Sequence, residues 1–312
     1  MTEQKECQLA SAVLMIRPTR FESNSHTAAS NVFQGKNPDP PEQQQEDAAR
    51  EFAGLCDALK AGGVEVIQFE DTEEPHTPDS VFPNNWVSFH ADGAVVYYPM
   101  MAPNRRAERR PDVINALADD YGFQIREIID LSEYEDNDEF LEGTGSLVLD
   151  RTNRIAYACL SARTHLKPLG DFAQRMDYEV VAFHALDRGG TPIYHTNVLM
   201  NVGEECAFIC ATAIPRNEQR RAVLTSLEKT GREVFTLSFN QMEAFAGNML
   251  ELRAQNGKRV VVMSNQALKS LNHSHISAIE ANAEIISVSI DSIECSAGGS
   301  VRCMLAEIHL QR

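Results

Sequence analysis

The sequence predicts an α/β fold in which five similar units close into a ring. The first observation is a strand–turn–strand pattern that recurs along the chain, led by residues 85, 145, 197, 248 and 300. A spacing of about 50 to 60 residues is typical of repeat architectures, whose units bury their apolar faces against one another. The second observation is that the fifth unit breaks off early, whereas the N-terminal segment supplies a strand and a helix with nothing before them. We therefore expect the N-terminal segment to complete the fifth unit.

The N-terminal segment is expected to contribute two strands and one helix. A short apolar strand at 12–16 comes first, and a helix at 42–60 follows the proline-rich segment 37–41. Gly62 and Gly63 end this helix, and a strand follows at 64–69. The alternative to a ring is an ordinary layered α/β domain in which the similarity between segments arose by chance.

Each repeat is expected to contain a hairpin, a helix and a closing strand. The hairpins are predicted at 85–90 with 94–99, 145–149 with 154–160, 197–202 with 206–210, and 248–252 with 259–263, and a fifth opens with a strand at 300–305. The helices are predicted at 106–121, 166–176, 218–229 and 274–281. The closing strands are predicted at 123–129, 179–183, 233–237 and 285–288. Trp86, the only tryptophan, is expected in the core.

Size and charge narrow the class of protein. A chain of 312 residues with 43% hydrophobic residues can bury one large core or two ordinary ones. The formal charge of -17 disfavours binding to nucleic acid. It favours solubility and could also attract cationic or zwitterionic small molecules. No apolar run approaches the roughly 18 residues that a membrane span needs.

The seven cysteines indicate a reducing compartment, because their number is odd and they lack the close, even spacing of a disulfide scaffold. Residues 1–8 are polar and of mixed charge, unlike a signal peptide. We therefore expect a cytoplasmic protein. Cys206 with Cys210, and His273 with His275, are the only pairs that suggest a metal site, and their spacing is not that of a zinc finger.

Three residues that a thiol-dependent enzyme needs lie at equivalent edges of different units. Cys303 follows Gly298 and Gly299, which let a backbone turn tightly and approach a ligand. His195 and Glu142 precede the third and second hairpins. A nucleophilic sulfur, an acid/base group and an orienting carboxylate would then meet at the centre of the ring. Alone, each has an ordinary interpretation as a core cysteine, a packed histidine or a turn carboxylate.

These segments resemble the guanidine-modifying enzymes, the pentein superfamily of amidinotransferases, arginine deiminases and dimethylargininases. The resemblance spans nearly the whole chain and rests on Leu141-Glu142-Gly143-Thr144-Gly145, His195-Thr196-Asn197-Val198 and Gly298-Gly299-Ser300-Val301-Arg302-Cys303. It implies a single domain over residues 1–312, a five-bladed pseudo-fivefold α/β propeller of ββαβ-type units. It also implies that Cys303 is the nucleophile, His195 the acid/base and Glu142 the catalytic acid. No metal or organic cofactor is implied.

The same resemblance assigns groups that bind an amino-acid substrate. Arg163, in Ser161-Ala162-Arg163-Thr164, matches an arginine that holds the substrate carboxylate. Arg105 or Arg106 is expected to play a similar role. The acidic run 133–139 is expected to be a solvated loop, or a lid over the site. Assembly into a homodimer is left open.

The departures from the superfamily pattern bear on the substrate. Asn85 and Asn197 stand where guanidinium-binding members usually carry aspartates, and Gly145 replaces another usual Asp. An asparagine offers both a donor and an acceptor, which suits a neutral ureido group, whereas buried aspartates facing a neutral group would be costly. We therefore expect a substrate such as citrulline, hydrolysed to ornithine, ammonia and carbon dioxide, as in the citrulline-utilisation hydrolases. Asp79 is a further carboxylate expected near the pocket, so a cationic substrate stays an alternative to citrulline.

Three other functions are alternatives to citrulline hydrolysis. Arginine deiminase or dimethylargininase activity would need a guanidino substrate, and an amidinotransferase would pass the carbon to an amine. A non-catalytic ring that binds partners would need neither Cys303 nor His195.

Overall fold

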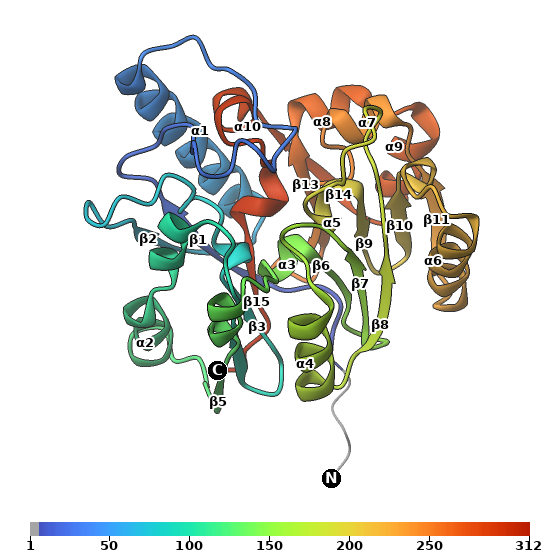
Figure 1. The fold of residues 1–312 in the computed structure, drawn as a ribbon, viewed down its shortest axis with the longest axis horizontal. Helices are drawn as coiled ribbons and strands as arrows, with labels where there is room; N and C mark the ends of the chain where they lie inside the picture. Colours follow the sequence, from blue (N-terminus) through green and yellow to red (C-terminus); the bar gives the residue numbers. More distant parts are fainter. Residues whose placement is uncertain (1–5) are drawn as a thin grey trace.

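The computed structural model describes residues 6–312 and contains five three-stranded sheets with helices around them (Figure 1). In four sheets, an antiparallel hairpin is followed by a third strand that runs parallel to the second. Their strands are β3 (Val87–Phe89), β4 (Ala94–Tyr97) and β5 (Glu127–Asp130); β6 (Leu147–Asp150), β7 (Ile155–Cys159) and β8 (Glu179–Phe183); β9 (Met200–Val202), β10 (Cys206–Ile209) and β11 (Glu233–Thr236); and β12 (Leu250–Arg253), β13 (Arg259–Ser264) and β14 (Glu284–Val288).

The fifth sheet joins the two ends of the described chain. Its strand order is β15 (Ala306–Ile308), β1 (Ala12–Arg17) and β2 (Glu65–Glu70). β15 pairs antiparallel with β1, so that Ala12 lies opposite Ile308, and β1 pairs parallel with β2. The expectation that the N-terminal segment completes the fifth unit is confirmed.

The longer helices lie around the outside of the five sheets (Figure 1). They are α1 (Pro41–Ala61), α2 (Pro111–Asp119), α4 (Leu166–Met176), α6 (Asn217–Lys229) and α9 (His273–Glu280). α1 begins with a proline, whose missing N–H costs nothing at that position, and Gly62 caps its end. Its apolar face buries Ala48, Phe52, Leu55 and Leu59, each large side chain contributing roughly 1.5–3 kcal/mol. Shorter helices are α7 (Phe239–Glu243), α8 (Asn265–Ser270) and α10 (Asp291–Ala297).

The middle strands of the sheets are buried on both faces. Every residue of β4 and β7 is buried, so these strands read as continuous apolar runs rather than alternating ones. Consecutive units touch through their first strands or the turns before them: β15 contacts β3, β6 contacts β9, and β9 contacts β12. Trp86 is fully buried, as expected.

The segments that lead into the hairpins differ from the sequence expectation. Four of them form single helical turns instead of strand starts: η1 (Pro83–Asn85), α3 (Gly143–Ser146), α5 (Thr196–Leu199) and η5 (Val301–Met304). Their backbone groups bond locally, as Gly145 N–H does to Glu142 O at 3.1 Å and Cys303 N–H to Ser300 O at 2.9 Å. Cys303 therefore lies on a 3₁₀ turn and not on a strand.

The prediction of a single helix at 106–121 is also wrong in its extent. It is divided into η2 (Pro103–Glu108) and α2, because Pro111 lacks an N–H and disfavours helical backbone at Arg110. The remaining 3₁₀ helices are η3 (Ser132–Asn137) and η4 (Ala211–Ala213).

Within residues 6–312, no helix has the length and apolar character to span a bilayer. Most of the polar N-terminal stretch that argued against a signal peptide lies outside the described residues.

Candidate active site

Cys303 is placed by a glycine-rich turn between α10 and β15. Gly298 caps α10 with φ +64°, a left-handed conformation that favours glycine. A Cβ on Gly299 would lie 2.7 Å from the Phe82 ring, so a larger residue here would force the ring to move. Cys303 is 3% exposed, and it lines a small, narrow pocket.

The eight site residues predicted from the sequence lie together. Six of them line this pocket: Asp79, Asn85, Arg105, Arg163, His195 and Cys303. Glu142 adjoins it through His195, whose Nε2 lies 2.8 Å from Glu142 Oε2. Asn197 adjoins it through Cys303, because Asn197 Nδ2–H donates to the sulfur at 3.4 Å.

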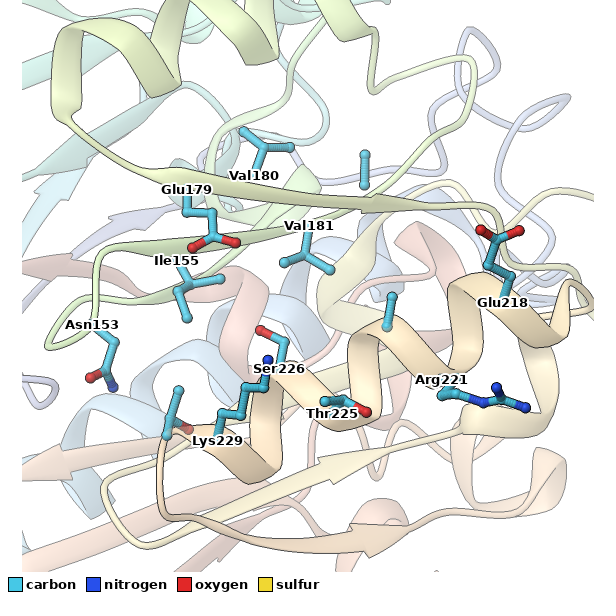
Figure 2. A pocket seen from close by; sticks show the side chains of 13 residues that line it. Asn153, Ile155, Glu179, Val180, Val181, Glu218, Arg221, Thr225, Ser226 and Lys229 are labelled. Atoms are coloured by element: carbon cyan, nitrogen blue, oxygen red, sulfur yellow. The ribbon is translucent and has the colours of Figure 1, made fainter.

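A larger groove elsewhere on the molecule contains none of these residues. It lies between the strand β8 and the helix α6 and is lined by Val180, Val181, Thr225, Ser226 and other residues of the two elements (Figure 2). Its side chains are aliphatic, hydroxyl, amide or charged, and the Ser226 hydroxyl is hydrogen-bonded to the Tyr157 hydroxyl at 3.0 Å. The smaller pocket at Cys303 is therefore the better candidate for chemistry.

His195 and Glu142 form a buried acid/base pair at the start of two helical turns. Burial lowers the pKa of His195 to about 4, and the hydrogen bond to Glu142 opposes this only in part. Burial acts to raise the pKa of Glu142, but Arg163 and His195 hold it well below its usual range. At neutral pH the carboxylate is charged and the imidazole is neutral, so that Nε2–H donates to Glu142 and Nδ1 can accept a proton.

Gly145 explains one departure from the superfamily motif. A Cβ at this position would lie 2.5 Å from Asn85 Nδ2 and 2.7 Å from His195 Nδ1. Real Cβ contacts are not that short, so the packing of Asn85 and His195 leaves no room for an aspartate side chain.

The two arginines are held by protein groups in this structure. Arg105 donates to both oxygens of Glu108 at 2.9 Å and to Asn85 Oδ1 at 3.0 Å. Arg163 donates to Ser30 Oγ at 2.7 Å and to Glu142 Oε2 at 3.4 Å, and its guanidinium lies over the Tyr194 ring. Arg106, the alternative to Arg105, lies outside the pocket and pairs with Glu135 at 3.4 Å.

Two buried acceptors near the pocket lack a hydrogen-bond partner among the described residues. They are Asn197 Oδ1 and Asp79 Oδ1, while Asp79 Oδ2 accepts from Asn24 Nδ2 at 2.7 Å. A buried acceptor without a partner costs about 1–3 kcal/mol. A ligand with N–H groups would satisfy both atoms.

Several residues of the site were not predicted. Asn31, Phe82 and Tyr194 line the pocket, and Asn248 Nδ2–H donates to the Cys303 sulfur at 3.3 Å. Asn248 leads the fourth hairpin, as Asn85 and Asn197 lead the first and third. Its position in the repeat could therefore have identified it as a site residue. No sequence pattern pointed to Phe82 or Tyr194.

Two other expectations concern groups away from the pocket. The acidic run 133–139 is not simply solvated, because both Glu135 oxygens accept from Arg109 and one also accepts from the Met100 N–H. In the part of the chain that the structure describes, no group of three or more histidine, cysteine or acidic side chains could hold a metal. His275 packs edge-on against Phe208 instead.

Solved structures with the same fold belong to guanidino-modifying enzymes. Full-length ArgZ, an arginine dihydrolase from the ornithine–ammonia cycle in cyanobacteria, superposes with a TM-score of 0.72 at 17% identity, over 95% of this chain and 40% of ArgZ. Its N-terminal domain, as a cysteine-to-serine mutant bound to substrate, gives 0.71 at 18% identity, over 94% of this chain and 96% of the domain. A mutant DDAH from Pseudomonas aeruginosa complexed with citrulline gives 0.66 at 13% identity, over 96% and 99%. This chain thus spans 40% of full-length ArgZ.

The fold and the site define the class of this protein as the pentein guanidino-modifying superfamily, whose hydrolases act on carbon–nitrogen bonds other than peptide bonds. No curated protein sequence matches the chain. Residues 17–310 match the family described as N,N dimethylarginine dimethylhydrolase, eukaryotic, and the chain belongs to that family. It is an enzyme of the hydrolase class.

Proposed function

We propose that the enzyme hydrolyses citrulline to ornithine, ammonia and carbon dioxide through a covalent intermediate on Cys303. The observation that carries this proposal is the kind of group around the sulfur. Both side chains that bond to it, Asn197 and Asn248, are neutral amides. A neutral ureido group matches these two amides, whereas a guanidinium would meet no anion among the side chains that bond to the sulfur.

The proposed reaction has two steps, formation of a covalent intermediate on Cys303 and its hydrolysis. His195 takes the proton of the Cys303 thiol, the thiolate attacks the ureido carbon, and a carbon–nitrogen bond breaks as His195 protonates the departing nitrogen. A thiocarbamate remains on the sulfur. Water then attacks this carbon with His195 as base, the carbon–sulfur bond breaks, and the carbamate loses carbon dioxide. The overall reaction consumes one water per citrulline.

The remaining groups are assigned to binding and orientation. Glu142 orients His195, Arg163 and Arg105 provide positive charge for the substrate carboxylate, and Asp79 Oδ1 accepts from its ammonium group. We also infer that the five sheets are the blades of one pseudo-fivefold α/β propeller, a single domain, whose axis passes through this site. The contacts between the first strands of consecutive units support that arrangement.

A guanidino substrate is the second candidate, and one observation favours it. Three buried carboxylates, Asp79, Glu108 and Glu142, surround only two guanidiniums, Arg105 and Arg163. A cationic side chain such as that of arginine would balance this excess. ArgZ is an arginine dihydrolase, and the family name refers to dimethylarginine.

Ammonia and ornithine release would decide between these candidates. The wild-type enzyme and Cys303→Ala are incubated separately with citrulline, arginine, dimethylarginine, and arginine plus glycine. Cys303-dependent ammonia and ornithine from citrulline support the proposal. Cys303-dependent turnover of arginine or dimethylarginine, with none of citrulline, would replace it by the guanidino alternative. A new amidino product with glycine would instead indicate a transferase.

A further inference from the structure

We propose that Glu294 is a positioning residue for the reaction, and that it fixes, through Ser300, the turn that carries Cys303. Glu294 lies on α10, and its Oε1 accepts the Ser300 hydroxyl at 2.6 Å. The Ser300 carbonyl accepts the Cys303 N–H at 2.9 Å. Glu294 is 4% exposed and Ser300 is fully buried, so water has little access to the hydrogen bond between them.

The Ser300 hydroxyl does not make the bond that its position in the chain favours. Ser300 is the N-cap of η5, where a serine hydroxyl ordinarily accepts an N–H of the turn that follows. Here the hydroxyl makes no such bond and donates to Glu294 instead. The side chain therefore connects α10 with η5 rather than stabilising η5 alone.

The other polar contacts of this glycine-rich segment do not replace that connection. Tyr194 and Asn31 donate to two carbonyls that precede Gly299, at 2.6 and 3.0 Å. Glycine has the widest backbone freedom of any residue, so these two contacts leave the chain beyond Gly299 free to shift. The bond from Ser300 to Glu294 holds the chain on the far side of that glycine.

A carboxyl group is a costly choice for the position of Glu294. Burial raises its pKa to about 7, although the hydrogen bond from Ser300 opposes this. The charged side chains that act on it, Asp291 and Glu51, are also acidic, and within residues 6–312 no basic side chain forms an ion pair with it. An apolar side chain would avoid this cost. The retention of an acceptor here supports a role for the hydrogen bond that it receives.

The expected consequence of losing this bond is a displacement of Cys303 and not the unfolding of its turn. Val301 and Met304, on either side of the turn, are fully buried in the apolar core and keep it in place. A shift of the turn changes the distance from the sulfur to His195 and to the carbon under attack, and rates are sensitive to such shifts. This step rests on the proposed role of Cys303 as nucleophile, and it holds for a ureido or a guanidino substrate.

Steady-state kinetics test the proposal, with whichever of citrulline, arginine and dimethylarginine the wild-type enzyme turns over. Glu294→Leu removes the acceptor, and we expect kcat to fall about 10- to 100-fold while KM stays within about twofold. Glu294→Gln keeps an oxygen that can accept from Ser300, so its kcat should stay within about threefold of the wild type.

Ser300→Ala removes the same hydrogen bond from its other end, and it serves as the second variant if Glu294→Leu fails to fold. Its kcat should fall as in Glu294→Leu. The double variant should be no more than about threefold slower than the slower single variant, because both changes break one connection. Independent, multiplying losses would show that Glu294 does not act through Ser300.

Glu51→Leu is the matched control, because Glu51 is a second buried acid that holds α10. It lies on α1 and accepts the Ser292 and Ile293 N–H groups at 2.9 and 3.0 Å, at the beginning of α10. Its loss should lower the midpoint of thermal unfolding by roughly 2–6 °C. Its kcat should remain within about threefold of the wild type.

Hydrogen–deuterium exchange of the peptide that contains Cys303 gives a second readout that needs no turnover. We expect this peptide to exchange roughly tenfold faster in Glu294→Leu and Ser300→Ala, and at the wild-type rate in Glu294→Gln and Glu51→Leu. If none of the substrates is turned over but exchange follows this pattern, the positioning role stands and the proposed function fails. If the wild type is active and folded Glu294→Leu keeps kcat within about threefold, or Glu51→Leu loses as much activity, the positioning role is overturned and the proposed function stands. Unchanged exchange in both Glu294→Leu and Ser300→Ala would also overturn it.

Discussion

Replacing Gly145 with alanine tests whether the geometry of the His195–Glu142 pair supports the reaction. The new methyl group would lie 2.5 Å from Asn85 Nδ2 and 2.7 Å from His195 Nδ1. To reach ordinary contact distances, these groups must move by about 0.7–0.9 Å. A shift of that size in the imidazole stretches its 2.8 Å contact with Glu142 toward 3.5 Å, where it no longer counts as a hydrogen bond.

The expected effect is on turnover. A misplacement approaching 1 Å costs about 100-fold in rate, which corresponds to about 2.7 kcal/mol of lost transition-state stabilisation. We therefore expect kcat for ammonia release from citrulline to fall about 100-fold in Gly145→Ala, with a smaller change in KM, because the groups assigned to the substrate carboxylate are not displaced directly.

Gly170→Ala is the control for the chemical change itself. Gly170 lies in α4, and a Cβ there meets nothing within 4 Å. Because alanine is the better helix former by about 1 kcal/mol, this variant should keep its kcat and unfold at a slightly higher temperature. If Gly145→Ala folds and retains kcat within about threefold of the wild type, less than 1 kcal/mol, the steric argument is refuted.

Three further predictions follow from buried charges. Arg163→Lys removes the planar fork that contacts Ser30 and Glu142, and KM for citrulline should rise about tenfold; steady-state kinetics with an unchanged KM would contradict this. Because burial lowers the pKa of His195 from 6.5 to about 4, the unfolded chain binds its proton first, and the free energy of unfolding should fall by up to about 3 kcal/mol as pH drops from 6.5 through 4. Urea titrations at several pH values should show a weaker dependence in His195→Gln, and an equal dependence would refute the assignment. Asp150→Ala leaves the buried Arg232 without its partner and should cost about 3–5 kcal/mol, which Arg232→Met in the same chain should largely restore in denaturant titrations.

Much of the fold could be predicted because it repeats. The segments 166–176 and 179–183 were expected as a helix and a strand, and α4 and β8 have those bounds. The single turns before the hairpins could not be predicted in this way, because four residues are too few to show a helical period. Their polar and glycine-rich sequences, such as Gly143 to Ser146, carry local hydrogen bonds and no periodic signal.

The central residues of the candidate site could also be predicted, but their partners could not. Cys303, His195 and Glu142 occupy corresponding places in different repeats, so the repeat brought them together. Ser30 and Thr27, which accept from Arg163 at 2.7 and 3.3 Å, come from the segment between β1 and α1. That segment has no counterpart in the other units, so no periodicity could connect it with the site.

The pairing of β1 with β15 has a consequence for how the chain is made. β1 leaves the ribosome before both of its partner strands, and its five residues Ala12 to Ile16 are buried in the folded chain. Its partner on one side, β2, follows soon, but its other edge stays open until residues 306–308 have been synthesised. An apolar strand with an open edge can pair with strands of other nascent chains.

Cys303 comes only three residues before β15, so the proposed nucleophile and the strand that closes this edge emerge together. During elongation the chain therefore carries an exposed edge and no reactive centre. A circular permutant that joins β15 directly to β1 would shorten the time for which this edge of β1 is unpaired during synthesis. Its yield of soluble protein at high expression should exceed that of the unpermuted chain.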